Sequence, residues 1–157
     1  MQAGDEFGHA GSNVFQTIVE QAPDAMIFAD RAGVIRLWNA AAETLFGHAA
    51  AAVLGASLDV IIPPALRRAH WDGFNRAIAS GQAKLGGRAL VTRSLHKDGS
   101  KLYVEPSFGL VRGATGAVVG ALALGRDCTA RHLAHSALRS RLAVLEQTAT
   151  AASNEQP

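Results

Sequence analysis

The hydrophobic pattern of the chain changes its period at Gly81, and this change limits the folds that are open to it. Residues 64–80 repeat apolar side chains at the 3.6-residue spacing of a helix, whereas residues 85–127 follow the two-residue spacing of strands. The turn sequences HKDGS (96–100) and RGATG (112–116) divide the second region into three strand-like runs. The pattern therefore predicts a long helix that stops at Gly81, followed by a three-stranded antiparallel meander.

Two of these strands carry features that constrain their place in a sheet. The run from Val118 to Leu124 is nearly all apolar, which is typical of a central strand covered on both faces. Pro106 interrupts the preceding strand, and proline has no amide hydrogen to donate to a neighbour. We therefore expect a bulge or an edge segment at Pro106.

The first part of the chain predicts a helix and then a hairpin. Apolar residues recur at helical spacing over 13–22, and Pro23 stops this helix. Two short β-like runs, AMIFAD (25–30) and GVIRLW (33–38), surround a tight-turn sequence.

Two short helices are predicted before the long one. Asn39 is the N-cap of the first, which Gly47 ends. The second runs from His48 to Leu54.

The helical period returns from Thr129 onward. Leu138, Leu142 and Leu145 follow each other at 4,3 spacing, the a/d rhythm of a coiled coil. This predicts an amphipathic helix over 130–148 that serves in signalling and dimerisation. The alternative is a helix that folds back over the sheet of its own domain.

Composition restricts the class of protein. With 157 residues, 48% of them hydrophobic and 18% charged, the chain predicts one globular domain over 13–129, between disordered tails at 1–12 and 149–157. The net charge is +2 with scattered basic residues, which argues against a nucleic-acid partner. The single cysteine, Cys128, excludes an internal disulfide and a CxxC site. There is no signal peptide and no apolar run of ~20 residues, so we expect a cytoplasmic protein without a membrane segment.

Several motifs in the correct order resemble a PAS domain over about residues 14–129. The opening hairpin leads into a "WN…A…LFG" signature, HKDGS stands between two long strands, and GRDCT resembles the end of the last strand. The signature residues are Trp38, Asn39, Ala41, Ala42, Leu45, Phe46 and Gly47. The resemblance implies an α+β fold: a five-stranded antiparallel sheet with short helices and one long helix on one face, flanked by N-terminal and C-terminal helices.

The same resemblance implies a pocket and a role in signalling. Between sheet and helices, such domains hold a cofactor or a small molecule, or fill the space with side chains. We expect a sensory module of signal transduction and not an enzyme, because no catalytic triad, P-loop, HExxH or kinase motif is present in the sequence.

Flavin adduct chemistry is excluded by the position of the cysteine. Light-sensing flavin-binding members carry a reactive cysteine in the helices before the long one. That region reads GHAAAAVLGASLDVII here and has no cysteine, whereas Cys128 stands at the exit of the sheet.

The FixL-type oxygen-sensing PAS domains are the closest in pattern, and they imply haem b as the cofactor. Their single histidine ligand falls on His70 in the long helix, so His70 is the predicted metal ligand. Arg88 matches a guanidinium that contacts bound oxygen or a propionate, and Arg76 matches a further propionate contact. The remaining predicted cofactor-binding residues are Trp71, Leu122 and Leu124, of which the leucines would form an apolar distal wall.

A second interpretation of these residues needs no haem. Histidine at this place packs near the surface in PAS domains without haem, Trp71 can fill the pocket, and Arg88 can be an exposed strand residue. The protein would then be a module without cofactor, or with a small organic ligand, that acts in dimerisation and protein–protein signalling. With either interpretation we expect a homodimer, because Phe15 and Ile18 add a second apolar stripe, and a downstream signalling protein or domain as partner.

Overall fold

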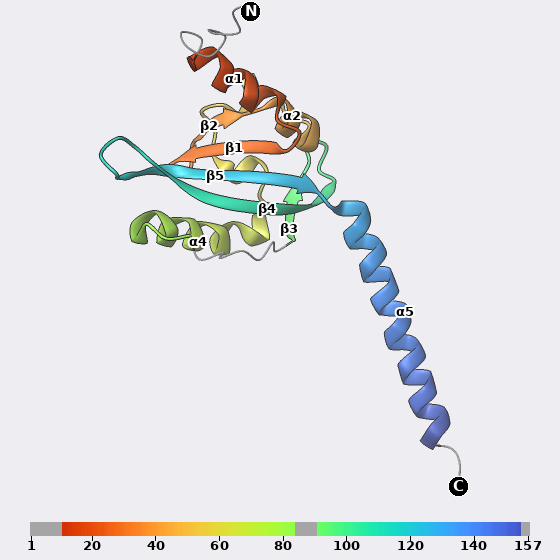
Figure 1. Ribbon diagram of the computed structural model, residues 1–157. Helices are drawn as coiled ribbons and strands as arrows, with labels where there is room; N and C mark the ends of the chain where they lie inside the picture. The colour runs from red at the N-terminus through yellow and green to blue at the C-terminus, as the bar shows by residue number, and fades with distance from the viewer. Residues whose placement is uncertain (1–10, 84–90, 155–157) are drawn as a thin grey trace, which may run out of the picture. The chain divides into compact units, whose positions relative to one another are not determined.

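The computed structural model describes residues 11–83 and 91–154, which form five strands and several helices (Figure 1). The first half contains α1 (Gly11–Gln21), β1 (Ala25–Asp30), β2 (Ile35–Trp38), α2 (Ala40–Phe46), α3 (Ala50–Val53) and the 3-10 turns η1 (Leu58–Val60) and η2 (Pro64–Leu66). The second contains α4 (Arg67–Ser80), β3 (Thr92–Leu95), β4 (Lys101–Arg112), β5 (Val118–Asp127) and α5 (Thr129–Asn154). The chain divides into two units, one ending at Asp127 and the other beginning at Cys128.

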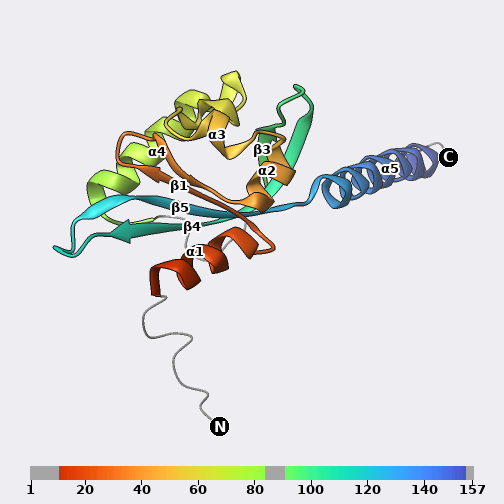
Figure 2. The same ribbon diagram turned by 90° about the horizontal axis from the view of Figure 1, so that it is seen from above.

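The five strands form one antiparallel sheet in the order β2-β1-β5-β4-β3. Both hairpins predicted around the HKDGS and RGATG turns are present, and β5 lies at the centre as expected. Figure 2 shows α3 and α4 on one face of this sheet and α1 on the other. The predicted α+β fold is therefore confirmed.

The core lies between the sheet and the helices that follow β2. In β1, burial alternates along the strand, so Ala25, Ile27 and Ala29 face the core. Ile35 and Phe46 close the core from β2 and α2. In β5, Val118 and Gly120 are buried, residues 121–125 are half-buried and Val119 is 40% exposed. The expectation that β5 is covered on both faces therefore fails at Val119.

Asn39 joins three segments of the chain in this core. Its side-chain oxygen accepts hydrogen bonds from the Ala42 and Met26 amides at 3.0 and 2.9 Å, which caps α2 and ties it to β1. Its amide nitrogen donates to the carbonyls of Val19 and Asp24 at 2.9 and 3.1 Å. The predicted N-cap is present, and the Asn39 side chain also fixes the exit from α1.

Pro106 does not bulge the strand in which it lies. It is paired with Gly125 in continuous register, and the irregularity of β4 comes later, between Val111 and Arg112. Pairing of β4 with β3 runs only as far as Val104, so within the described residues Pro106 has β5 alone as a hydrogen-bonded neighbour. The bulge expected at Pro106 is therefore wrong; the residues that would lie opposite Pro106 beyond β3 are outside the described ones, so the edge segment stays a prediction.

Three helix boundaries differ from those predicted. The long helix begins as the turn η2 and becomes α-helical only at Arg67. The helix predicted over His48 to Leu54 is the shorter α3. The last helix continues to Asn154, past the predicted end at residue 148, through an alanine-rich sequence that favours helix.

Candidate functional site

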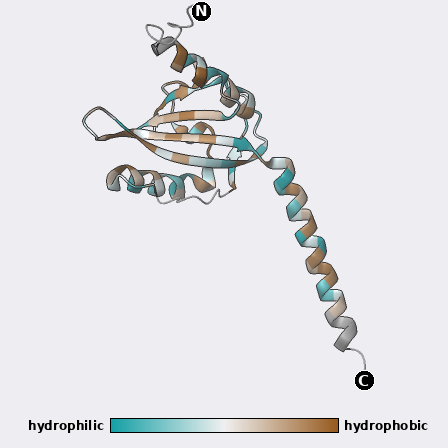
Figure 3. Cartoon of the chain, in the orientation of Figure 1, coloured by the Kyte–Doolittle hydropathy of each residue, from teal (hydrophilic) through white to brown (hydrophobic). Residues whose placement is uncertain are grey.

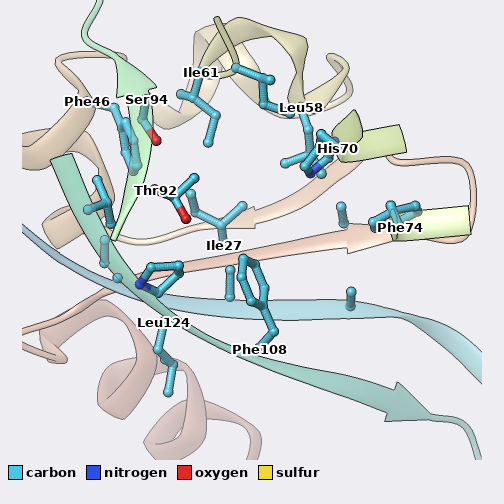
Figure 4. A pocket seen from close by; sticks show the side chains of 18 residues that line it. Ile27, Phe46, Leu58, Ile61, His70, Phe74, Thr92, Ser94, Phe108 and Leu124 are labelled. Carbon is cyan, nitrogen blue, oxygen red and sulfur yellow. The ribbon is translucent and has the colours of Figure 1, made fainter. Parts of the chain in front are cut away.

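A cavity lies between the sheet and α4, inside the unit that ends at Asp127 (Figure 4). It holds about 120 Å³ of open space, and most of its walls are aliphatic or aromatic. The polar side chains that line it are His70, Thr92 and Ser94. Thr92 is exposed and Phe108 is 40% exposed, so the cavity is open at their side. This is an apolar binding pocket with a few polar groups on its wall.

His70 is the ionisable side chain of this cavity. Its ring stacks on Phe74, one helical turn further along α4, with ring centroids 6.1 Å apart. Its Nδ1 atom is buried and has no hydrogen-bond partner among the residues that the structure describes. Burial lowers the pKa of His70, and the negative charge of Asp59 opposes this only in part. At neutral pH the imidazole is therefore neutral, with a lone pair free to bind a metal or accept a hydrogen bond.

Trp71 does not line the cavity, but its ring packs edge-on against the rings of His70 and Phe74, which do, with centroids 5.0 and 5.5 Å away. It anchors α4. Its indole nitrogen donates a hydrogen bond of 2.9 Å to Oδ1 of Asp59, in the turn η1. Its ring lies against Gly33, in the turn between β1 and β2, so closely that a Cβ on that glycine would overlap the indole. Arg67 adds a second link, because its Nη2 donates to the Asp59 carbonyl at 3.1 Å. Trp71 is thus not a lining residue of the cavity. Its contacts fix the rotation of α4 about its own axis, and this rotation turns His70 toward the cavity.

The other sequence-predicted site residues are not gathered at the cavity in the way expected. Arg76 is exposed, does not line it, and donates from Nε to the Asp72 carbonyl at 3.0 Å. Leu122 does not line it either, and Leu124 lines it with its side chain turned away (Figure 4). Arg88 lies outside the described residues.

The absence of Leu122 from the cavity wall comes from alternation along β5. Ala121 and Ala123 line the cavity, and side chains one residue further along a strand point to the opposite face. An almost continuously apolar strand gives no signal of which set faces inward. Sequence reasoning also missed Thr92 and Ser94, whose two-residue spacing in β3 was the available signal.

Comparison with known families identifies the fold. A family model described as the PAS fold matches residues 14–128. The chain belongs to the PAS family. Sequence relatives of this PAS domain include the oxygen sensor protein DosP of Escherichia coli, 29% identical over 121 residues, which are 77% of this chain and 15% of DosP.

Two further relatives are a sensor protein and an uncharacterised protein. The sensor protein FixL of Bradyrhizobium diazoefficiens is 28% identical over 94 residues, 60% of this chain and 19% of FixL. An uncharacterised protein of Azorhizobium caulinodans is 35% identical over 91 residues, 57% of this chain and 12% of that protein. The PAS chain thus spans less than a fifth of the length of these three relatives.

Solved structures agree on the fold. A PAS domain from Colwellia psychrerythraea superposes with a TM-score of 0.65 at 25% identity, covering 75% of this chain and 97% of that one. An RNA-binding light-oxygen-voltage receptor has a TM-score of 0.67 at 24% identity, covering 91% and 40%. Within the described residues, no helix is long and apolar enough to cross a membrane, and no three His, Cys, Asp or Glu side chains gather as a metal site.

Proposed function

We propose that this PAS domain is a sensory module that binds haem b through His70 and responds to a diatomic gas or to redox state. The observation that carries the proposal is the neutral imidazole of His70, which lines an apolar cavity with one buried nitrogen unpartnered among the described residues. Two sequence relatives are named as an oxygen sensor and a sensor protein, which favours this class of signal.

The side chains that line the cavity have the chemical properties that a haem site needs. A haem needs one nitrogen donor on one side and an apolar surrounding, and His70 with its aliphatic and aromatic neighbours offers both. When bound, haem supplies iron with an open sixth position for a gas. The protein would supply a single imidazole, which its burial keeps neutral, and walls that are mostly apolar.

The cavity must widen to accept a porphyrin. The cavity volume of about 120 Å³ is close to that of an engineered cavity of 150 Å³ that binds benzene. Both volumes are far smaller than a porphyrin. The element best able to move is α4, because none of its residues is buried. Only Trp71 and Phe74 of α4 pack against the core as partly buried apolar side chains. We infer that cofactor entry moves α4 away from the sheet about its anchor, where Trp71 stays on Gly33 and Asp59.

Arg76 and Arg88 are the residues proposed to contact the charged groups of the cofactor or the bound gas. Arg76, which is exposed on α4, can meet a propionate only where it extends out of the cavity. For Arg88 the proposal is the one that the sequence resemblance implies, a contact to a bound gas or to a propionate. The apolar wall on the sheet side consists of Ala121 and Ala123, whose small side chains leave room above the strand. The change at the cavity would be passed to a downstream signalling protein or domain.

The test is an absorption spectrum of the purified protein after titration with haemin. We expect a Soret band that saturates at one haem per chain and a loss of affinity of at least ~10-fold in His70→Ala. Imidazole added to His70→Ala should restore the band, because it replaces the missing ligand. The matched control is His135→Ala, an exposed histidine on α5. The absence of a Soret band, or equal binding by His70→Ala, would overturn the proposal.

A second candidate rests on the volume of the cavity as it stands. About 120 Å³ of mainly apolar space suits a small organic ligand of the size of benzene. Thr92 and Ser94 would give such a ligand its few polar contacts. Titration of haem-free protein with small aromatic compounds, followed by thermal unfolding, separates the two candidates: stabilisation without a Soret band supports the second.

A further inference from the structure

The second half of α4 is held against the sheet by little apolar packing. None of the residues of α4 is buried, and Figure 3 shows a mixture of hydrophilic and hydrophobic residues along the helix. The apolar side chains of α4 that pack against the buried core are Trp71 and Phe74. Among the described residues, positions 75–80 add no apolar side chain to this core packing. The end of α4 is therefore the part of the helix that packing secures least.

Arg112, at the end of β4, makes a polar contact with the residue that follows α4. Its Nη2 atom donates a hydrogen bond of 2.8 Å to the Gly81 carbonyl, and its Nη1 atom donates one of 3.0 Å to the Gly116 carbonyl. Gly116 lies in the turn between β4 and β5, so the guanidinium joins the end of α4 to this hairpin. We call these two hydrogen bonds the Arg112 latch.

The end of α4 is suited to receive a guanidinium from another element. α4 has no basic residue in its own last turn, where the partial negative charge of the helix carbonyls favours a cation. Gly81 has φ +65°, and a Cβ at this position would lie 3.1 Å from Nη2 of Arg112. Glycine thus ends the helix and leaves room for the guanidinium. Arg112 supplies the positive charge that the helix itself lacks there.

We propose that the Arg112 latch is a gate of the cavity, which opens when a cofactor enters and stays open while it is bound. This inference rests on the proposed function, because only an occupant larger than the present cavity requires α4 to move. Phe74 lines the cavity and lies between Trp71 and the latch, so opening carries its ring away from the sheet. His70 also lines the cavity but lies beside the anchored Trp71, so it keeps its place.

A gate and a merely structural contact predict opposite effects on binding. The latch stabilises the closed form of the free domain, so its removal raises the fraction of molecules that are open to a cofactor. The apparent affinity for a ligand rises in proportion to this fraction. Loss of a contact that only supports the fold would instead weaken binding.

The first test measures hydrogen exchange of the haem-free chain. The Gly81 amide donates to the Ala77 carbonyl at 2.9 Å and reports on the last turn of α4. In Arg112→Ala, amides of residues 77–81 should exchange at least ~3-fold faster, while amides near Trp71 stay unchanged. The matched control is Arg126→Ala, which removes an exposed arginine that donates to Asp24 at 2.6 Å; it should leave α4 unchanged. Unaltered exchange in Arg112→Ala, or equal acceleration along the whole helix, would overturn the latch.

The second test follows haemin binding by stopped-flow absorption. Arg112→Ala should bind haemin about 3- to 10-fold faster and correspondingly more tightly, the range expected for one hydrogen bond from an exposed charged group. Arg112→Lys keeps a cation that can donate to the Gly81 carbonyl, so its rate should lie closer to that of the unchanged chain. Slower or weaker binding by Arg112→Ala would refute the gate. A chain that binds no haemin overturns the proposed cofactor, and hydrogen exchange alone then decides on the latch.

Discussion

Replacing Gly33 by alanine tests whether the anchor of Trp71 controls the site. Gly33 has φ +75°, and a Cβ at this position would overlap the six-membered ring of the Trp71 indole. The ring cannot stay in place, and its hydrogen bond to Asp59 depends on that place. We expect Gly33→Ala to displace Trp71, and with it the start of α4 and the imidazole of His70.

The magnitude follows from three contributions. Alanine in the left-handed region costs about 1–2 kcal/mol. Overpacking against the indole costs about 1–3 kcal/mol where the surroundings yield. The lost hydrogen bond to the Asp59 carboxylate adds about 1 kcal/mol, taken low because that side chain is partly exposed. Together these contributions should lower the free energy of unfolding of Gly33→Ala by about 3–6 kcal/mol.

Gly55 provides the matched control. It has φ +87°, and nothing lies within 4 Å of the Cβ it would gain. Gly55→Ala should therefore lower the free energy of unfolding only by the backbone strain, about 1–2 kcal/mol. Urea unfolding followed by circular dichroism gives both values. In a nitrogen–proton NMR spectrum, the indole signal of Trp71 should shift in Gly33→Ala, while that of the buried Trp38 stays.

The haem titration extends the comparison to function. Gly33→Ala should bind haemin more weakly than the unchanged chain, whereas Gly55→Ala should bind it equally well. Equal stability losses in the two alanine variants, or an unshifted Trp71 signal, would refute the reasoning that this indole positions α4.

Two further predictions concern the stability of the PAS domain. Asn39→Ala removes four hydrogen bonds from a fully buried side chain, and urea unfolding should show a loss of about 3–5 kcal/mol; a loss below 1 kcal/mol would contradict the role of Asn39 in joining the segments. Hydrogen bonds from Ser100 and His96 lower the pKa of Asp98 to about 2. A lowered pKa of a carboxyl stabilises the folded state above the unfolded pKa near 4, and this contribution is lost as the pH falls toward 2. Asp98→Asn should therefore lose less stability than the unchanged chain between pH 4 and 2, and parallel curves would show that Asp98 contributes nothing.

The elements of the fold were predictable because their signals are local. Asn39 and Gly47 cap α2 with the side-chain bond and the left-handed backbone that their residue types favour. The HKDGS and RGATG turns each place a glycine at positive φ, at Gly99 and Gly116. Such signals need only neighbouring residues. The place of Pro106 depended on how far β3 extends beside β4, which no residue near Pro106 encodes.

The cavity was predicted less well because its walls come from segments far apart in the sequence. His70 was found by resemblance to a family with a histidine at that place. The inward side of β5 was not found, since Leu122 and Ala123 are both apolar and only the pairing with β1 decides between them. The contact of Trp71 with Gly33 joins a helix to a turn that precedes it by almost forty residues, and no pattern along the chain predicts it.

That contact explains why two adjacent residues of one helix have opposite roles. Successive residues of an α-helix point about 100° apart, so His70 lines the cavity while Trp71, packed edge-on against its ring, reaches the turn at Gly33. The indole is received by Gly33, the one residue type without a side chain, and is held there by Asp59. With Trp71 held in this way, the imidazole of His70 lies toward the cavity. The proposed haem site therefore requires Gly33 and Asp59 as well as the histidine, and a chain with the same histidine but a larger residue at the turn would be expected to present it differently.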